Sequence, residues 1–240
     1  MFSRSGIAAN RQITDYFANF FALSEPDRSS NSAEFRFWFI EALHLGATHA
    51  DFNGRRRAWA DDSYVHANGF AKLIVFVTEC ASFRLRVHVW PQGIGIGSLN
   101  VHNHRYSFAS FIEQGSVKDV LWTCSDAGES FRRFTYSSRN IAGNYRLEYQ
   151  GIQALKIEKV RKFSRGHLYS LSPDQLHYTI PECTSATVTF FAEDRRNLRS
   201  TATTYSRHHA VDEIETFTPS LSYTEYQRTV GRYIRGPASA

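Results

Sequence analysis

The pattern of apolar residues along the chain changes near residue 69. Before that point, apolar and aromatic residues at helical spacing predict two amphipathic helices, over residues 8–24 and 33–44. The Gly-, Asp- and Asn-rich stretch that follows, up to residue 68, predicts irregular structure.

From residue 69 the chain predicts strands. Short runs rich in β-branched and aromatic residues succeed one another with Gly-containing breaks, as in a sandwich or barrel. The predicted strands cover residues 72–78, 83–90, 107–112, 117–123, 131–136, 145–149, 155–160, 167–171 and 186–192. We therefore expect an all-β core, with helices before it and a short C-terminal helix over residues 223–234.

This pattern divides the chain into three regions. Residues 1–68 form an N-terminal helical region that packs on a barrel of residues 69–195. The polar segment 196–240 forms a C-terminal extension.

Composition narrows the class of protein. Of 240 residues, 42% are hydrophobic and 15% aromatic, which is enough for a packed core, and no apolar run approaches the length of a membrane span. The N-terminus lacks the apolar run of a secretion signal. Cys80, Cys124 and Cys183 are widely spaced without a CxxC pair, as is typical of reduced thiols. We therefore expect a cytoplasmic protein.

Charge gives little sign of a macromolecular partner. The formal charge of +5 comes from 28 basic and 23 acidic residues that are scattered along the chain. The compact basic run 55–57 indicates a solvated loop, and no recognition helix, zinc-finger spacing or RNA-binding signature occurs. The sequence predicts no nucleic-acid partner and no membrane partner. Aromatic-rich helices on a barrel are compatible with a homodimer.

Two histidines at i and i+2 give the strongest chemical signal. His102 and His104 lie in a strand-like segment, where alternate side chains share a face, and His177 lies in a second such segment. If both segments pair in one barrel, the three imidazoles converge on one divalent ion and leave coordination positions open. Because the chain has 10 histidines, a chance pair of surface or core histidines stays as the alternative.

The segments that contain these histidines resemble the two motifs of the cupin superfamily. Residues 97–115 resemble the first motif and residues 166–177 the second, within a similarity that covers residues 69–193. The resemblance implies a double-stranded β-helix, which is a jelly-roll barrel with a metal in its mouth.

One departure from the cupin pattern points to a branch of the superfamily. The usual glutamate ligand would fall four positions after His104, where this chain has Phe108. A three-histidine site without a carboxylate resembles the cysteine dioxygenase branch, and so does the lead-in segment 83–93. The resemblance implies Fe(II) as cofactor, with a small-molecule substrate and O2 reacting at the iron without an external reductant.

The resemblance also implies a substrate anchor. Lys72 lies about where thiol dioxygenases carry an arginine that grips the substrate carboxylate. Arg86 and His88 share one face of a predicted strand, and we expect that face to line the barrel rather than contact solvent.

Three tyrosines are candidate catalytic residues. Tyr106 lies on the predicted face of the paired histidines, and Tyr169 and Tyr178 flank His177. In thiol dioxygenases a tyrosine near the iron hydrogen-bonds oxygen or substrate, so the resemblance implies this role for one of them.

These inferences predict a non-haem iron dioxygenase that acts on a thiol, an amino acid or an aromatic metabolite. Two alternatives stay open. One is a cupin isomerase or lyase that uses zinc, nickel or manganese as a Lewis acid. The other is a non-enzymatic cupin that binds a small molecule.

Overall fold

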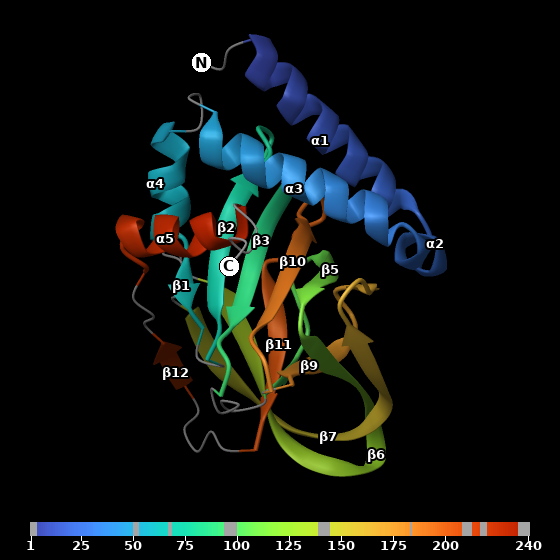
Figure 1. Cartoon of the computed structure of the whole chain (residues 1–240). Helices are drawn as coiled ribbons and strands as arrows, with labels where there is room; N and C mark the ends of the chain where they lie inside the picture. The colour runs from blue at the N-terminus through green and yellow to red at the C-terminus, as the bar shows by residue number, and fades with distance from the viewer. Residues whose placement is uncertain are drawn as a thin grey trace.

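The computed structural model describes residues 4–49, 53–66, 69–93, 100–138, 145–182, 184–207, 213–216 and 220–234. Figure 1 shows a β-sandwich with helices packed over one of its faces. The helices in these ranges are α1 (Arg4–Ala22), α2 (Glu25–Ser30), α3 (Ser32–Thr48), α4 (Asn53–Asp61) and α5 (Tyr223–Ile234).

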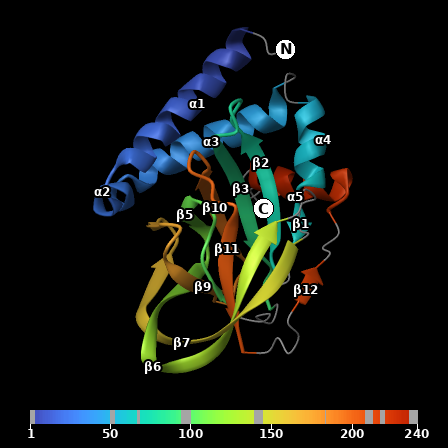
Figure 2. The same ribbon diagram turned by 180° about the vertical axis from the view of Figure 1, so that it is seen from behind.

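The strands form two antiparallel sheets. Across the first sheet lie β1 (Tyr64–Val65), β2 (Ala71–Val77), β3 (Phe83–Trp90), β10 (Thr187–Asp194), β5 (Ser107–Gln114) and β8 (Leu168–Leu171). Across the second lie β11 (Thr201–Ser206), β4 (Val101–His102), β9 (Leu176–Pro181), β6 (Ser116–Ser138), β7 (Tyr145–Ser164) and β12 (Glu213–Thr216). Figure 2 shows the long β6–β7 hairpin of the second sheet from behind.

The eight strands from β3 to β10 follow the jelly-roll order. Numbered from one to eight along the chain, they lie in the order 1-8-3-6 in the first sheet and 2-7-4-5 in the second. Most successive strands therefore cross between the sheets, which winds the chain into a double-stranded β-helix. The strand order and the flanking helices confirm the predicted fold class.

The largest hydrophobic cluster lies between the helices and the outer face of the first sheet. Phe39 of α3 stacks on Phe190 of β10, with ring centroids 4.5 Å apart. On β3, Leu85 and Val87 are buried in the same cluster. Because neighbouring side chains on a strand point to opposite faces, Arg86 between them faces the other sheet. The helices thus leave the inner face of the first sheet to line the barrel.

Several predicted boundaries differ from the structure; among them, the strands predicted at 145–149 and 155–160 form the single strand β7. Residues 53–61 were expected to be irregular but form α4, because Trp59 and Ala60 pack into the main cluster and this packing outweighs a poor helix composition. The strands predicted at 117–123 and 131–136 join into the single strand β6. Register shifts along its pairing with β7 let the strand bend without ending.

The segment after residue 195 contributes to the second sheet. β11 pairs with both β4 and β6, and β12 pairs with β7. The terminal helix was predicted over the range that α5 occupies, and α5 packs against α3, α4 and β2. The division of the chain into three regions stays a prediction. The strand pairings show that residues beyond 195 extend the sandwich.

Some features of the sequence fall outside the described residues. These are Cys183, Gly97 in the first cupin-like motif, and the tail beyond residue 234. Cys80 and Cys124 are free thiols. In the described part of the chain, every helix is too short or too polar to cross a bilayer.

Candidate metal centre

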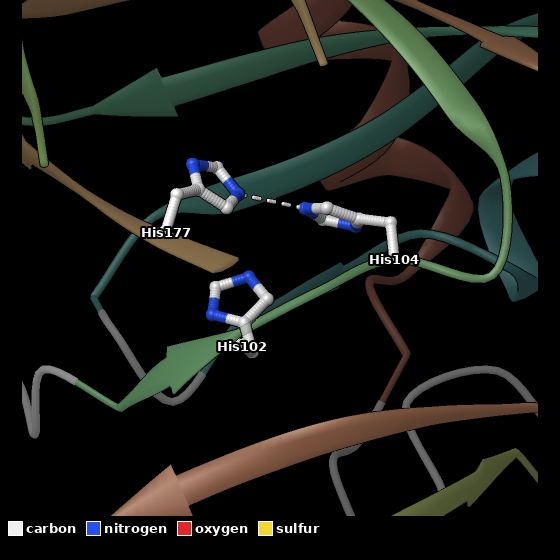
Figure 3. A group of neighbouring side chains, drawn as sticks. All are labelled: His102, His104 and His177. Carbon is white, nitrogen blue, oxygen red and sulfur yellow. Dashed lines mark hydrogen bonds between the residues drawn. The ribbon is translucent and has the colours of Figure 1, made fainter. Parts of the chain in front are cut away.

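The three histidines singled out in the sequence lie together between the two sheets. His102 ends β4 and pairs directly with His177 of β9, and His104 follows two residues later. Figure 3 shows the three rings turned toward one another. One nitrogen from each ring lies within 4.8 Å of the other two. The jelly-roll topology therefore brings together side chains that are far apart in the sequence.

The spacing of the nitrogen atoms fits a bound transition metal. His104 Nε2 lies 2.9 Å from His177 Nε2. Two nitrogens that bind one ion at right angles, each at about 2.1 Å, are about 3.0 Å apart. The donor set of three imidazoles suits iron, zinc, copper and nickel. The residues present therefore fit a divalent transition metal.

The electrostatic surroundings keep two of the imidazoles neutral. Burial, with repulsion from His177, lowers the pKa of His102 to about 3. Burial, with repulsion from the other two histidines, also lowers the pKa of His104 well below its ordinary value. His102 Nδ1 lies 2.9 Å from the carbonyl oxygen of Asn100, which accepts a hydrogen bond from it. Neutral imidazoles with a free nitrogen are the form that binds metal ions.

A carboxylate that the sequence reading missed lies behind His177. Asp119 Oδ1 is 2.7 Å from His177 Nδ1, and Asp119 Oδ2 accepts hydrogen bonds from Arg161. Burial alone would raise the pKa of Asp119, but the bonds to His177 and Arg161 outweigh it and hold that pKa below its ordinary value. Alternation along the strand could have indicated this residue, because Asp119 lies between Val117 and Leu121 on the same face.

Aromatic side chains enclose the histidines on the side of the first sheet. Phe108 lies edge-on to His104 at 4.7 Å and stacks on Phe191 at 4.5 Å. Phe108, at the position of the usual cupin glutamate, therefore supplies an apolar wall. The ring of Tyr106 is buried 5.5 Å from His104, and its hydroxyl accepts a hydrogen bond from Arg86 Nη1 at 3.3 Å.

Charged groups occupy the inner face of the first sheet. Arg86 Nη1 lies 2.5 Å from Glu193 Oε1, and the side chains are 9% and 1% exposed. Lys72 lies on the neighbouring strand, with Nζ 5.7 Å from the centre of the Tyr64 ring. Lys72 is partly exposed, and its desolvation, with repulsion from Arg86, lowers its pKa to about 7.

His88 joins Lys72 in a row across the sheet. His88 is the cross-strand partner of both Lys72 and Thr189. Within the described residues, His88 Nε2 and Thr189 Oγ1 are buried without a hydrogen-bond partner. The three residues predicted to bind substrate, Lys72, Arg86 and His88, therefore share the inner face of the first sheet.

The structure separates the candidate tyrosines. Tyr106 contacts His104, as described above. Tyr169 is buried behind Phe108 and stacks on Phe163 at 4.5 Å, beside Arg161.

Tyr178 packs near Trp122 in a cluster on the opposite face of the second sheet, because it follows His177 directly on β9. Tyr178 is therefore not brought to the histidines.

Comparisons with known proteins add little to this picture. No protein-family model and no curated protein matches the chain. Among solved structures, a cupin-like protein from Thermotoga maritima is 9% identical with a TM-score of 0.33, over 70% of this chain and 87% of the other. Hydroxypropylphosphonic acid epoxidase from S. wedmorenis is 10% identical with a TM-score of 0.36, over 56% of each chain.

One solved structure whose name is not that of an enzyme is as similar to this chain as the epoxidase is. The 11S allergen from Cocos nucifera is 16% identical with a TM-score of 0.36, over 58% of this chain and 35% of the other. At such identities and scores the comparisons distinguish no activity. The jelly-roll assignment rests on the strand order, and the metal centre rests on its own geometry.

Proposed function

We propose that this protein is a mononuclear non-haem Fe(II) dioxygenase that acts on a small metabolite with O2 and without an external reductant. The observation that carries the proposal is the three-histidine group, whose ligand nitrogens lie within 4.8 Å of one another. Iron held by three imidazoles keeps open positions for substrate and oxygen, and it supplies a path for electrons between them.

The residues around the histidines have separable tasks. Phe108 and Phe191 exclude water from one side of the centre. The ring of Tyr106, 5.5 Å from the ring of His104, would contact the substrate, and its hydroxyl is held in place by Arg86 and Glu193. Resemblance to the cysteine dioxygenase branch agrees with this arrangement, because that branch also uses three histidines without a carboxylate.

The charges on the inner face favour an acidic substrate. Four basic side chains, Arg86, Arg84, Lys72 and Arg195, act electrostatically on the buried carboxylate of Glu193. In the described part of the chain, Lys72 forms no ion pair with a carboxylate. An excess of enclosed positive charge is costly unless an anion offsets it. Among the substrate classes, a thiol or amino acid with a carboxylate group therefore fits better than a neutral aromatic compound.

The first test is metal content after anaerobic purification, by elemental analysis. We expect about one iron per chain in the wild type, and none in His104→Ala, whose melting curve serves as a control for folding. Oxygen uptake is then screened with thiols, amino acids and phenols, each with and without a carboxylate. Lys72→Met should raise KM for acidic substrates and leave KM for neutral ones unchanged.

Three results would contradict the proposal. Stoichiometric zinc or nickel, with no oxygen uptake after reconstitution with iron, would favour a Lewis-acid isomerase or lyase. No metal after reconstitution would favour a small-molecule-binding protein. If Lys72→Met changes KM equally for acidic and neutral substrates, Lys72 does not select an acidic substrate. A cytoplasmic location and a homodimer stay predictions, which fractionation and sedimentation can test.

A further inference from the structure

Asp119 and Arg161 form a buried pair directly behind the metal centre. Asp119 is 0% exposed and Arg161 is 14% exposed. Arg161 donates from Nη2 and Nε to Asp119 Oδ2, at 2.7 and 3.2 Å. The other oxygen, Oδ1, accepts from His177 Nδ1 at 2.7 Å and from Thr179 Oγ1 at 3.4 Å. Because both oxygens are engaged, the carboxylate is held in one orientation.

Arg161 is itself held in place by its surroundings. Its guanidinium carbon lies 5.2 Å from the centre of the Phe163 ring and 5.7 Å from that of Tyr169. Its Nη1 reaches Glu25 at the start of α2, at 3.5 Å. A planar guanidinium fixed by two rings presents its paired donors to Asp119 in one direction.

This arrangement determines which nitrogen of His177 carries the proton. An imidazole that binds a metal through one nitrogen keeps its N–H on the other, and the hydrogen bond to Asp119 places that N–H of His177 on Nδ1. The lone pair is then on Nε2, which faces His104 Nε2 at 2.9 Å. For His102 the corresponding bond goes to the backbone carbonyl of Asn100. For His177 it goes to a side chain, which substitution can remove.

We infer that Asp119 and Arg161 act as one positioning unit that fixes the tautomer and ring angle of His177 and thereby sets the metal affinity of the three-histidine group. The inference rests on the proposed function only in so far as that group binds a metal. Asp119 acts through His177 and is a positioning residue. Partners of this kind typically change metal affinity by about 10–100-fold.

The metal test uses Zn²⁺ with a competing chelator, which requires no turnover. We expect Asp119→Asn to weaken binding about 10–100-fold. Arg161→Met should weaken it less, because Asp119 remains but is free to rotate. The double variant should bind no more weakly than Asp119→Asn alone, since residues that act as a unit are not additive. The control is Glu113→Gln, which removes a carboxylate from the bidentate Arg36–Glu113 pair and should leave Zn²⁺ affinity unchanged.

A second measurement reads the tautomer without any metal. In metal-free protein with ¹⁵N-labelled histidines, NMR should show His177 as the Nδ1–H form in the wild type. In Asp119→Asn, the Nε2–H form should appear. Where that variant unfolds, Asp119→Leu/Arg161→Met removes both charges together and serves instead, because an apolar replacement of a buried ion pair is commonly tolerated.

The two measurements separate the inference from the proposed function. Wild-type binding of Zn²⁺, with equal affinity and the same tautomer in both Asp119 variants, would overturn the inference and leave the metal centre intact. If the wild type binds no metal, the proposed function is wrong, and so is the inferred effect of Asp119 and Arg161 on metal affinity. In that case the tautomer measurement alone decides whether Asp119 positions His177.

Discussion

The two faces of the first sheet are built from the same strands but differ in chemistry, because only the inner face adds buried charged groups to its aromatic side chains. The face toward the helices carries Leu85, Val87 and Phe190, which are buried among phenylalanines from α1 and α3. The inner face carries Arg86 and Glu193, which are nearly as well buried. Apolar burial stabilises the fold, whereas enclosing charges costs free energy that their attraction offsets only in part. The comparison indicates that the outer face maintains the fold and the inner face is shaped for a ligand.

The largest effect on stability is expected on the outer face. Phe39→Ala removes a fully buried ring that stacks on Phe190, and it should lower the free energy of unfolding by about 3–5 kcal/mol. Urea denaturation measures this loss, and a Zn²⁺ titration of the folded variant should give the wild-type affinity. A parallel loss of affinity would mean that the two faces are not separable.

The buried ion pair of the inner face should respond differently to single and double substitution. Glu193→Gln leaves Arg86 enclosed without its carboxylate partner, and we expect a loss of about 3 kcal/mol. The double variant Arg86→Met/Glu193→Leu should recover part of it, because Arg86 is no longer enclosed without a carboxylate, although Arg84 and Lys72 also lose Glu193. Urea denaturation of all three proteins tests this. If the double variant has as low a free energy of unfolding as Glu193→Gln, the Arg86–Glu193 pair itself stabilises the fold.

Lys72 gives the inner face a pH dependence that the outer face lacks. Its folded-state pKa of about 7 lies below the ordinary value of 10.5, so the unfolded chain binds more protons between these two pKa values. The free energy of unfolding should therefore rise with pH in this window, by at most about 1.4 kcal/mol per pH unit. The difference between wild type and Lys72→Met, measured by urea denaturation from pH 6 to 10, should show this rise. A pH-independent difference would contradict it.

The smallest effect is expected from a half-exposed ion pair. Arg36 of α3 and Glu113 of β5 are 43% and 21% exposed, and solvent screens their attraction. Glu113→Gln should cost at most about 1 kcal/mol in thermal or urea unfolding. A loss as large as that of Glu193→Gln would show that burial does not separate the two pairs.

Alternation along strands made much of the fold and the site predictable. The apolar and polar positions of β3 predicted which side chains share a face, and the spacing of His102 and His104 predicted that both approach His177. These are local rules that a single sequence displays. The exact partners across the barrel depend on strand order, which the sequence displays only through resemblance to a family.

The missed features depend on packing between distant segments. α4 contains Gly54 and a run of arginines, and it is a helix because Trp59 and Ala60 pack on the sheet. Asp119 directly follows the exposed Lys118 in β6, so the sequence alone does not show that its carboxylate is buried. Its role appears only when β6 lies beside β9 and Arg161 approaches from β7. Sequence periodicity contains no such information.

The pairing of His102 with His177 has a consequence for folding. These residues come from β4 and β9, so the three imidazoles meet only when these two strands, distant in the sequence, have paired. Contacts of such long sequence separation form slowly, because loop closure is paid for in entropy first. We therefore expect a metal ion to bind after these strands have paired, and once bound it opposes opening of the barrel by mass action. Release of the metal on heating should coincide with global unfolding rather than precede it.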